Sequence, residues 1–147
     1  MGASGRVEAV CISARKGERK RPAPVIRLVP GRGVEGDAHA GTERQVSLLA
    51  TESLDKLRSK GLKVGPGDLA ENITTSGLEL CALPVGTILT VGAGALEVTQ
   101  IGKECHAPCA IAAQAGECVM PTEGVFARVV TGGEVRAGDS IEVADSP

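Results

Sequence analysis

Short apolar stretches, separated at close intervals by glycine and proline, run through the whole chain and predict β-strands. The strongest local signal is a hairpin in which Gly92-Ala93-Gly94 joins two of these stretches. The expected strands are Val7–Ser13, Val25–Val29, Arg44–Leu49, Leu69–Thr74, Thr87–Val91, Ala95–Ile101, Val125–Val130 and Ser140–Val143.

One stretch has a helical pattern instead. Thr51 is placed to cap a helix that runs to about Lys60, Leu54 and Leu57 give it an apolar stripe, and Gly61 suits the C′ position. Many strands and one or two short helices predict a mostly β fold, a closed or partly open β-barrel. The 147 residues predict a single domain, 1–147, with its core at about 7–143.

Composition excludes several classes of function. Aromatic residues make up 1% of the chain and the formal net charge is −2, which argues against stacking on nucleic-acid bases and against a basic field for phosphate backbones. The basic run Arg15–Arg21 is expected to be a solvated loop, with a patch for an anionic substrate as the alternative. No stretch is long and apolar enough for a signal or membrane helix, so we expect no membrane association and a cytoplasmic location with reduced thiols.

The five cysteines are the first chemically informative feature. Cys105, Cys109 and Cys118 cluster in the segment from Gly102 to Gly124, which in a reducing compartment favours reactive or metal-binding thiols over a disulfide scaffold. The other two, Cys11 and Cys81, have apolar neighbours and are expected to be buried packing residues.

The cysteine-rich segment allows four interpretations. Zinc is the minority one, with Cys105, Cys109 and Cys118 as ligands and either His39 or His106 as the fourth. Cys118 as a reactive thiolate, activated by nearby cations, is the second. In the third, Cys105 and Cys109 exchange thiols with Cys118 and release a persulfide sulfur. In the fourth, all three cysteines are buried packing residues without a chemical role. Lys103, His106, Arg44 and Arg128 are the candidate activating groups.

Two polar motifs elsewhere are candidates for the same site. Asp37 and His39 lie in the glycine-rich segment Gly31–Gly41, where His39 could act as a base, a ligand or a loop-organising hydrogen bonder, and Asp37 could simply bond the turn. Glu71 and Asn72 fall within an expected strand, so they either face solvent or line a polar cavity, and we favour the cavity.

In order and spacing, these motifs resemble the molybdenum-cofactor sulfurase C-terminal (MOSC) domain family, in its short stand-alone bacterial form. The resemblance extends from about Val7 to Val143. The matching motifs are Gly36-Asp37-x-His39-x-Gly41, Arg44 to Leu49, Glu71-Asn72-Ile73-Thr74, Leu83-Pro84-Val85-Gly86, Val98 to Gly102, and Cys118-x-Met120-x-x-x-Gly124.

The resemblance implies a barrel of the MOSC or pyruvate-kinase-barrel type and a cysteine that carries sulfur as a persulfide. It implies Cys118 as the nucleophile of a sulfurtransferase linked to molybdenum cofactor (pterin) metabolism, with Cys105 or Cys109 as resolving or alternative carrier thiols. The substrate would be bound by Lys103, His106, Arg44, His39, Asp37, Glu71 and Asn72. A carbon–sulfur lyase acting on a small thio-compound and a non-catalytic module binding the cofactor or a metal are the alternatives.

The same resemblance sets the expected cofactors and partners. We expect no tightly bound cofactor, with molybdopterin as a ligand, and zinc only in the minority interpretation. Sulfurases of the family carry a pyridoxal-phosphate desulfurase domain that is not found in this sequence, so a separate cysteine desulfurase or a molybdoenzyme-maturation protein is the expected partner. The small-molecule partner is a sulfur-containing or pterin substrate.

Overall fold

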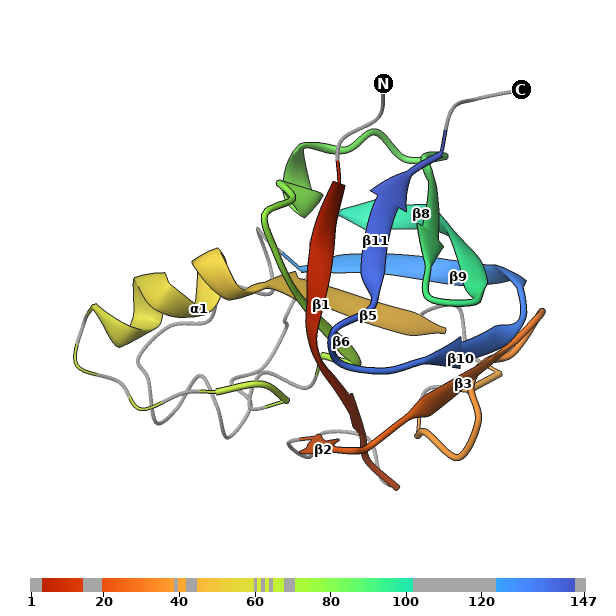
Figure 1. Cartoon of the computed structure of the whole chain (residues 1–147), viewed down its shortest axis with the longest axis horizontal. Helices are drawn as coiled ribbons and strands as arrows, with labels where there is room; N and C mark the ends of the chain where they lie inside the picture. Colours follow the sequence, from red (N-terminus) through yellow and green to blue (C-terminus); the bar gives the residue numbers. More distant parts are fainter. Residues whose placement is uncertain are drawn as a thin grey trace.

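A closed barrel of seven strands forms the body of the protein (Figure 1). The computed structural model describes residues 4–14, 20–38, 40–41, 45–59, 61, 63, 65–67, 71–101 and 124–144. In order around the barrel the strands are β1 (Ser4–Ile12), β11 (Ser140–Val143), β7 (Ile88–Val91), β8 (Gly94–Ile101), β9 (Val125–Thr131), β5 (Val46–Ala50) and β6 (Ile73–Ser76). Antiparallel pairing of β1 with β11 closes the ring, which confirms the predicted closed barrel.

One neighbouring pair of barrel strands, β5 and β6, is parallel, and this explains the position of the helix. Parallel strands cannot be joined by a tight turn, so the chain needs a crossover between them. The helix α1 (Thr51–Arg58) begins directly after β5 and forms part of that crossover, at the side of the barrel in Figure 1. Leu54 and Leu57 are fully buried, as their spacing predicts.

Both ends of α1 differ slightly from the expectation. Thr51 is the first helical residue rather than the cap: Ala50 occupies the N-cap position, and no side chain caps the helix. Ser59 is the C-cap, so Gly61 lies one position beyond the predicted C′ site, although it does have a positive φ of 87°. Shifts of this size are common at helix ends, where the backbone groups have several alternative partners.

A small three-stranded sheet lies against one end of the barrel. It consists of β10 (Gly133–Val135), β3 (Ile26–Val29) and β4 (Gly33–Val34), while β2 (Arg21–Pro22) pairs with the last residues of β1. The glycine-rich segment Gly31–Gly41 therefore contains β4, and neither β4 nor β10 was among the expected strands. A 3₁₀ turn, η1 (Leu80–Ala82), was not predicted either.

Alternating side chains from the barrel strands fill the interior. Leu48, Ile73, Leu89 and Val98 are all fully buried in one core cluster, as the period of two along a strand requires. In the part of the chain that the structure describes, no helix is long and apolar enough to cross a membrane. The predicted strand Leu69–Thr74 is displaced in the structure: β6 runs from Ile73 to Ser76, so Glu71 and Asn72 precede it.

Candidate functional site

The predicted site residues divide into two groups. Asp37, Glu71 and Asn72 are described, and all three are buried, which excludes the alternative in which Glu71 and Asn72 face solvent. Arg128, a candidate activating group, is also described, but it is exposed and forms an ion pair with Glu97. The remaining predicted residues lie outside the described part of the chain: Lys103, Cys105, His106, Cys109, Cys118, His39 and Arg44. The site can therefore be built from the three buried residues and the strands that hold them.

Asn72 ties three segments together at the start of β6. Its Oδ1 accepts hydrogen bonds from the Ser47 backbone N–H (3.0 Å) and from the Ser47 hydroxyl (3.1 Å). Its Nδ2 donates to the Cys11 carbonyl at 3.1 Å, and the Cys11 N–H donates to the Asn72 carbonyl at 2.7 Å. Because an amide side chain both donates and accepts, Asn72 can join the end of β1 to β5. The burial of Asn72 is thus matched by hydrogen bonds to two other segments of the chain.

Asp37 is bound at the same end of β1, where its partner Ser13 lies two residues beyond Cys11. Its Oδ1 accepts a hydrogen bond from the Ser13 N–H at 3.0 Å and forms an ion pair with the Lys20 ammonium at 2.8 Å. Lys20 also donates to the Ser13 hydroxyl at 3.1 Å. Both charged side chains are 0% exposed, so each replaces the hydration that the other has lost.

Glu71 is a second buried carboxylate beside Asn72. Its Oε2 accepts a hydrogen bond from the Thr74 hydroxyl at 2.9 Å, and both residues are 0% exposed. A carboxylate in such a position has a fixed orientation and can accept further hydrogen bonds. Together with Asp37 and Asn72, it makes this end of β1 and β6 rich in buried polar groups.

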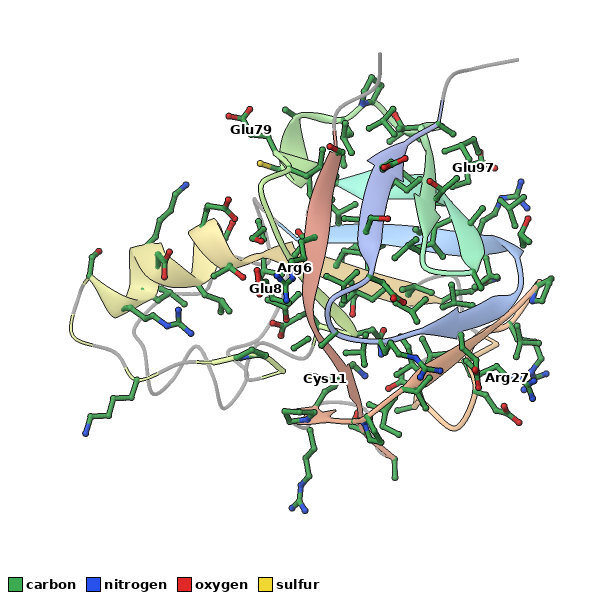
Figure 2. All side chains as sticks on the ribbon, viewed as in Figure 1. Arg6, Glu8, Cys11, Arg27, Glu79 and Glu97 are labelled. Carbon is green, nitrogen blue, oxygen red and sulfur yellow. The ribbon has the colours of Figure 1, made fainter. Side chains whose placement is uncertain are left out.

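Close backbone packing completes this end of the barrel. Gly67 has a φ of 86°, its carbonyl accepts a hydrogen bond from the Lys20 N–H at 2.8 Å, and a Cβ added there would lie 3.1 Å from the Cys11 Sγ. Figure 2 shows Cys11 near the end of β1, close to β2. The segments around Cys11, Lys20 and Gly67 are thus in direct contact.

The strands also fix the two ends of the cysteine-rich segment. Ile101, at the end of β8, is paired with Val125, at the start of β9. The neighbouring Phe126 pairs with Ser47, the residue bound by Asn72. The chain therefore enters and leaves the segment 102–123 on the same side of the barrel, within two strands of Asn72.

Comparison with known proteins gives the family. The family model described as "MOSC domain" matches residues 35–142, most of the chain. The chain belongs to the MOSC domain family. Membership supports, at the level of the family, a function related to the molybdenum cofactor. The matched range includes Asp37, Glu71 and Asn72 but begins after Ser13 and Lys20.

Solved structures share the fold of this MOSC domain at low sequence identity. The YuaD protein from Bacillus subtilis is 21% identical with a TM-score of 0.83, and the match covers 100% of this chain and 99% of that one. YiiM from Geobacillus stearothermophilus is 17% identical with a TM-score of 0.73, covering 96% and 75%. YiiM from Escherichia coli is 21% identical with a TM-score of 0.68, covering 97% and 71%. No curated protein sequence matches the chain.

Sequence reasoning did not identify Lys20 and Ser47, two of the residues that bind Asp37 and Asn72. Lys20 belongs to the basic run expected to be a solvated loop, yet it is 2% exposed, so that expectation was wrong for this residue; Arg21 is exposed as expected. Burial of a lysine depends on a carboxylate distant in sequence, here Asp37, and no local pattern reveals it. Ser47 could have been noticed as a polar residue within an otherwise apolar strand.

The two described cysteines differ from each other. Cys11 is fully buried, as predicted, but Cys81 is exposed, so the prediction of burial was wrong for Cys81. Its neighbours in η1 explain the difference, because Leu80 turns into the core and Cys81 follows it on a tight 3₁₀ turn. Cys81 lines a surface pocket of about 480 Å³ with Lys56 and Glu79. Figure 2 shows Glu79 far from Cys11.

This contrast predicts different reactivity of the two thiols in the native protein. N-ethylmaleimide should modify Cys81 rapidly and leave Cys11 intact until the protein unfolds, because alkylation requires access to the thiolate. Peptide mapping by mass spectrometry after a short exposure would measure both sites. A denatured sample is the control in which both react. Equal modification of Cys11 and Cys81 in the native protein would contradict the burial of Cys11.

Among the described residues, no group of three or more histidine, cysteine or acidic side chains is arranged to hold a metal ion. The zinc set of Cys105, Cys109, Cys118 and His39 lies outside those residues. Zinc binding therefore stays a prediction to be tested with the protein.

Proposed function

We propose that this MOSC protein carries sulfur as a persulfide on Cys118 and exchanges it with the molybdenum cofactor as substrate. The observation that carries the proposal is the anchoring of the cysteine-rich segment. Its two flanks, Ile101 and Val125, pair with each other beside the strand whose Ser47 binds the buried Asn72. Family membership supports the link to the cofactor.

The chemistry needs one nucleophilic thiolate and a persulfide donor, R–S–SH. The Cys118 thiolate attacks the terminal sulfur of the donor, the donor's S–S bond breaks, a new S–S bond forms on Cys118, and the donor leaves as the thiolate R–S⁻. The transferred sulfur keeps its oxidation state, so this step requires no further oxidant or reductant. Covalent transfer in two stages divides one difficult displacement into two easier ones.

Cys105 or Cys109 resolves the persulfide when the acceptor is absent. The resolving thiolate attacks the Cys118 sulfur, displaces HS⁻ and leaves a disulfide, which two equivalents of a small thiol then reduce. Lys103, His106, Arg44 and His39 are proposed to bind the anionic or heteroaromatic parts of the substrate. Asp37, Glu71 and Asn72 support them from buried positions, because their side chains are held by protein partners.

Intact-mass spectrometry after incubation with cysteine persulfide tests this function. The exposed Cys81 thiol can react with the persulfide donor outside the proposed site, so all variants should be made in a Cys81→Ala background. At short incubation times, before the persulfide is resolved, the parent should gain the mass of one sulfur atom, which dithiothreitol removes, and Cys118→Ala should lose most of that gain, on the order of tenfold or more. Cys105→Ala and Cys109→Ala should keep the sulfur and release it more slowly.

Two outcomes would contradict the proposal. If Cys118→Ala still gains a sulfur that dithiothreitol removes, the carrier is another residue. If protein purified without chelator contains stoichiometric zinc and its clustered thiols resist alkylation, the segment is a metal site instead.

A further inference from the structure

Three polar residues outside the barrel strands form one buried cluster. Ser13 follows β1, Lys20 precedes β2, and Asp37 follows β4. The Asp37 Oδ1 accepts from both the Lys20 ammonium and the Ser13 N–H, and the Ser13 hydroxyl accepts from the same ammonium. The cluster therefore joins three connecting segments to one another.

The position of this cluster argues against a role in holding the barrel. The barrel is closed by strand pairing around an apolar core that contains none of the three residues. A buried ion pair is also weak evidence for stability, because desolvating two charges offsets much of their attraction. What the Lys20–Asp37 pair does determine is the geometry of the segments it connects.

We propose that Lys20 is a positioning residue for the loop that carries Asp37. Lys20 lies before the range matched by the MOSC family model, whereas Asp37 lies within it. The ammonium neutralises Asp37 in its buried position, and Asp37 then holds the Ser13 amide. The Ser13 carbonyl in turn accepts a hydrogen bond from the Ala38 N–H at 2.8 Å. The loop is thereby fixed at Asp37 and at Ala38.

Removing the ammonium should release this loop without opening the barrel. An unpaired carboxylate is strongly disfavoured in a buried site, so Asp37 would turn toward water and give up its bond to Ser13. As the loop moves, the Ala38 N–H would also lose its hydrogen bond to the Ser13 carbonyl. The effect on sulfur loading rests on the proposed function, whereas the effect on the loop does not.

Amide hydrogen exchange measures the loop directly. In Lys20→Met, exchange at the Ser13 and Ala38 amides should accelerate at least about tenfold, which corresponds to about 1.4 kcal/mol. Exchange at the Val98 and Val129 amides, in the barrel, should change by a smaller factor. Arg128→Met is the matched control, because it removes one partner of the exposed Arg128–Glu97 ion pair and should leave the loop amides unchanged.

The double variant Lys20→Met/Asp37→Leu separates positioning from stability. An apolar pair of similar size should restore most of the thermal stability that Lys20→Met loses. The Ala38 amide should still exchange rapidly, although its backbone acceptor at Ser13 is intact. Sulfur loading of Cys118 should stay reduced severalfold in both variants.

Each result either supports or contradicts the positioning role of Lys20. Rapid exchange at Ala38 with a protected barrel supports the proposal, whether or not the parent protein loads sulfur. If the parent loads no sulfur, the proposed function fails and the loop measurement still stands. Unchanged exchange at Ser13 and Ala38 in Lys20→Met, an equal acceleration throughout the barrel, or full recovery of loop protection in the double variant would overturn the positioning role.

Discussion

Gly67→Ala is expected to lower the free energy of unfolding by about 3–5 kcal/mol, from overpacking together with a strained backbone. The added methyl group would lie against the Lys20 carbonyl, well under the 3.0 Å that real Cβ contacts keep, and 3.1 Å from the Cys11 Sγ. The φ of 86° adds the cost of a left-handed conformation. Because backbone atoms are on the other side of the clash, no side-chain movement relieves it.

Gly61→Ala is the matched control for this prediction. Gly61 has a φ of 87°, nearly the same as Gly67, but an added Cβ meets nothing within 4 Å. It should therefore cost only the conformational part, about 1–2 kcal/mol. Urea denaturation of both variants would measure the difference. Equal losses of stability for the two substitutions would show that the close approach of Gly67 to Lys20 is not present in solution.

Asn72→Ala is expected to cost about 3 kcal/mol, because it removes partners from three buried backbone or hydroxyl groups. The Ser47 N–H and hydroxyl lose their shared acceptor, and the Cys11 carbonyl loses a donor. Thermal or chemical denaturation measures the loss. Asn72→Asp should also destabilise the protein, since a carboxylate would then face the Cys11 carbonyl oxygen.

A double-mutant cycle with Ser47→Ala tests whether the loss comes from this pair. The two single substitutions should be non-additive by about 0.5–3 kcal/mol, because each removes part of the same set of hydrogen bonds. Thr87→Ala is the control for a hydroxyl whose bond, to the Pro84 carbonyl, is exposed. It should change stability by no more than about 1 kcal/mol. Additive effects at positions 47 and 72 would contradict the Asn72 network.

The barrel was predictable because its strands are encoded locally. Alternation along β8 and β9 and the glycine turn before β8 are visible in the sequence, and the structure confirms the hairpin of β7 with β8. The short strands β2 and β4 were not predicted, because two-residue strands have no period to detect. Their pairing depends on neighbours that only the tertiary fold supplies.

The site was less predictable than the fold. Asp37, Glu71 and Asn72 were identified as unusual polar residues, and their burial agrees with that. The hydrogen-bond partners of Asp37 and Asn72 were not identified, because they are distant in sequence. Lys20 is 17 positions from Asp37, and Ser47 is 25 positions from Asn72. The error over Cys81 has the same origin: an apolar neighbourhood in sequence does not say which side of a tight turn a residue will occupy.

Closure of the ring by β1 and β11 has a consequence for how the protein forms. During synthesis from the N-terminus, β1 is made first of the described strands and its partner β11 is made last. The pairing of Ser4–Arg6 with Ser140–Glu142 can therefore form only after the rest of the barrel has been synthesised. Until then the incomplete sheet has an open edge at β1, the kind of edge that other chains can add to. We therefore expect slow, late closure, governed by long-range contacts, and a period of vulnerability to aggregation that ends when the last strand docks.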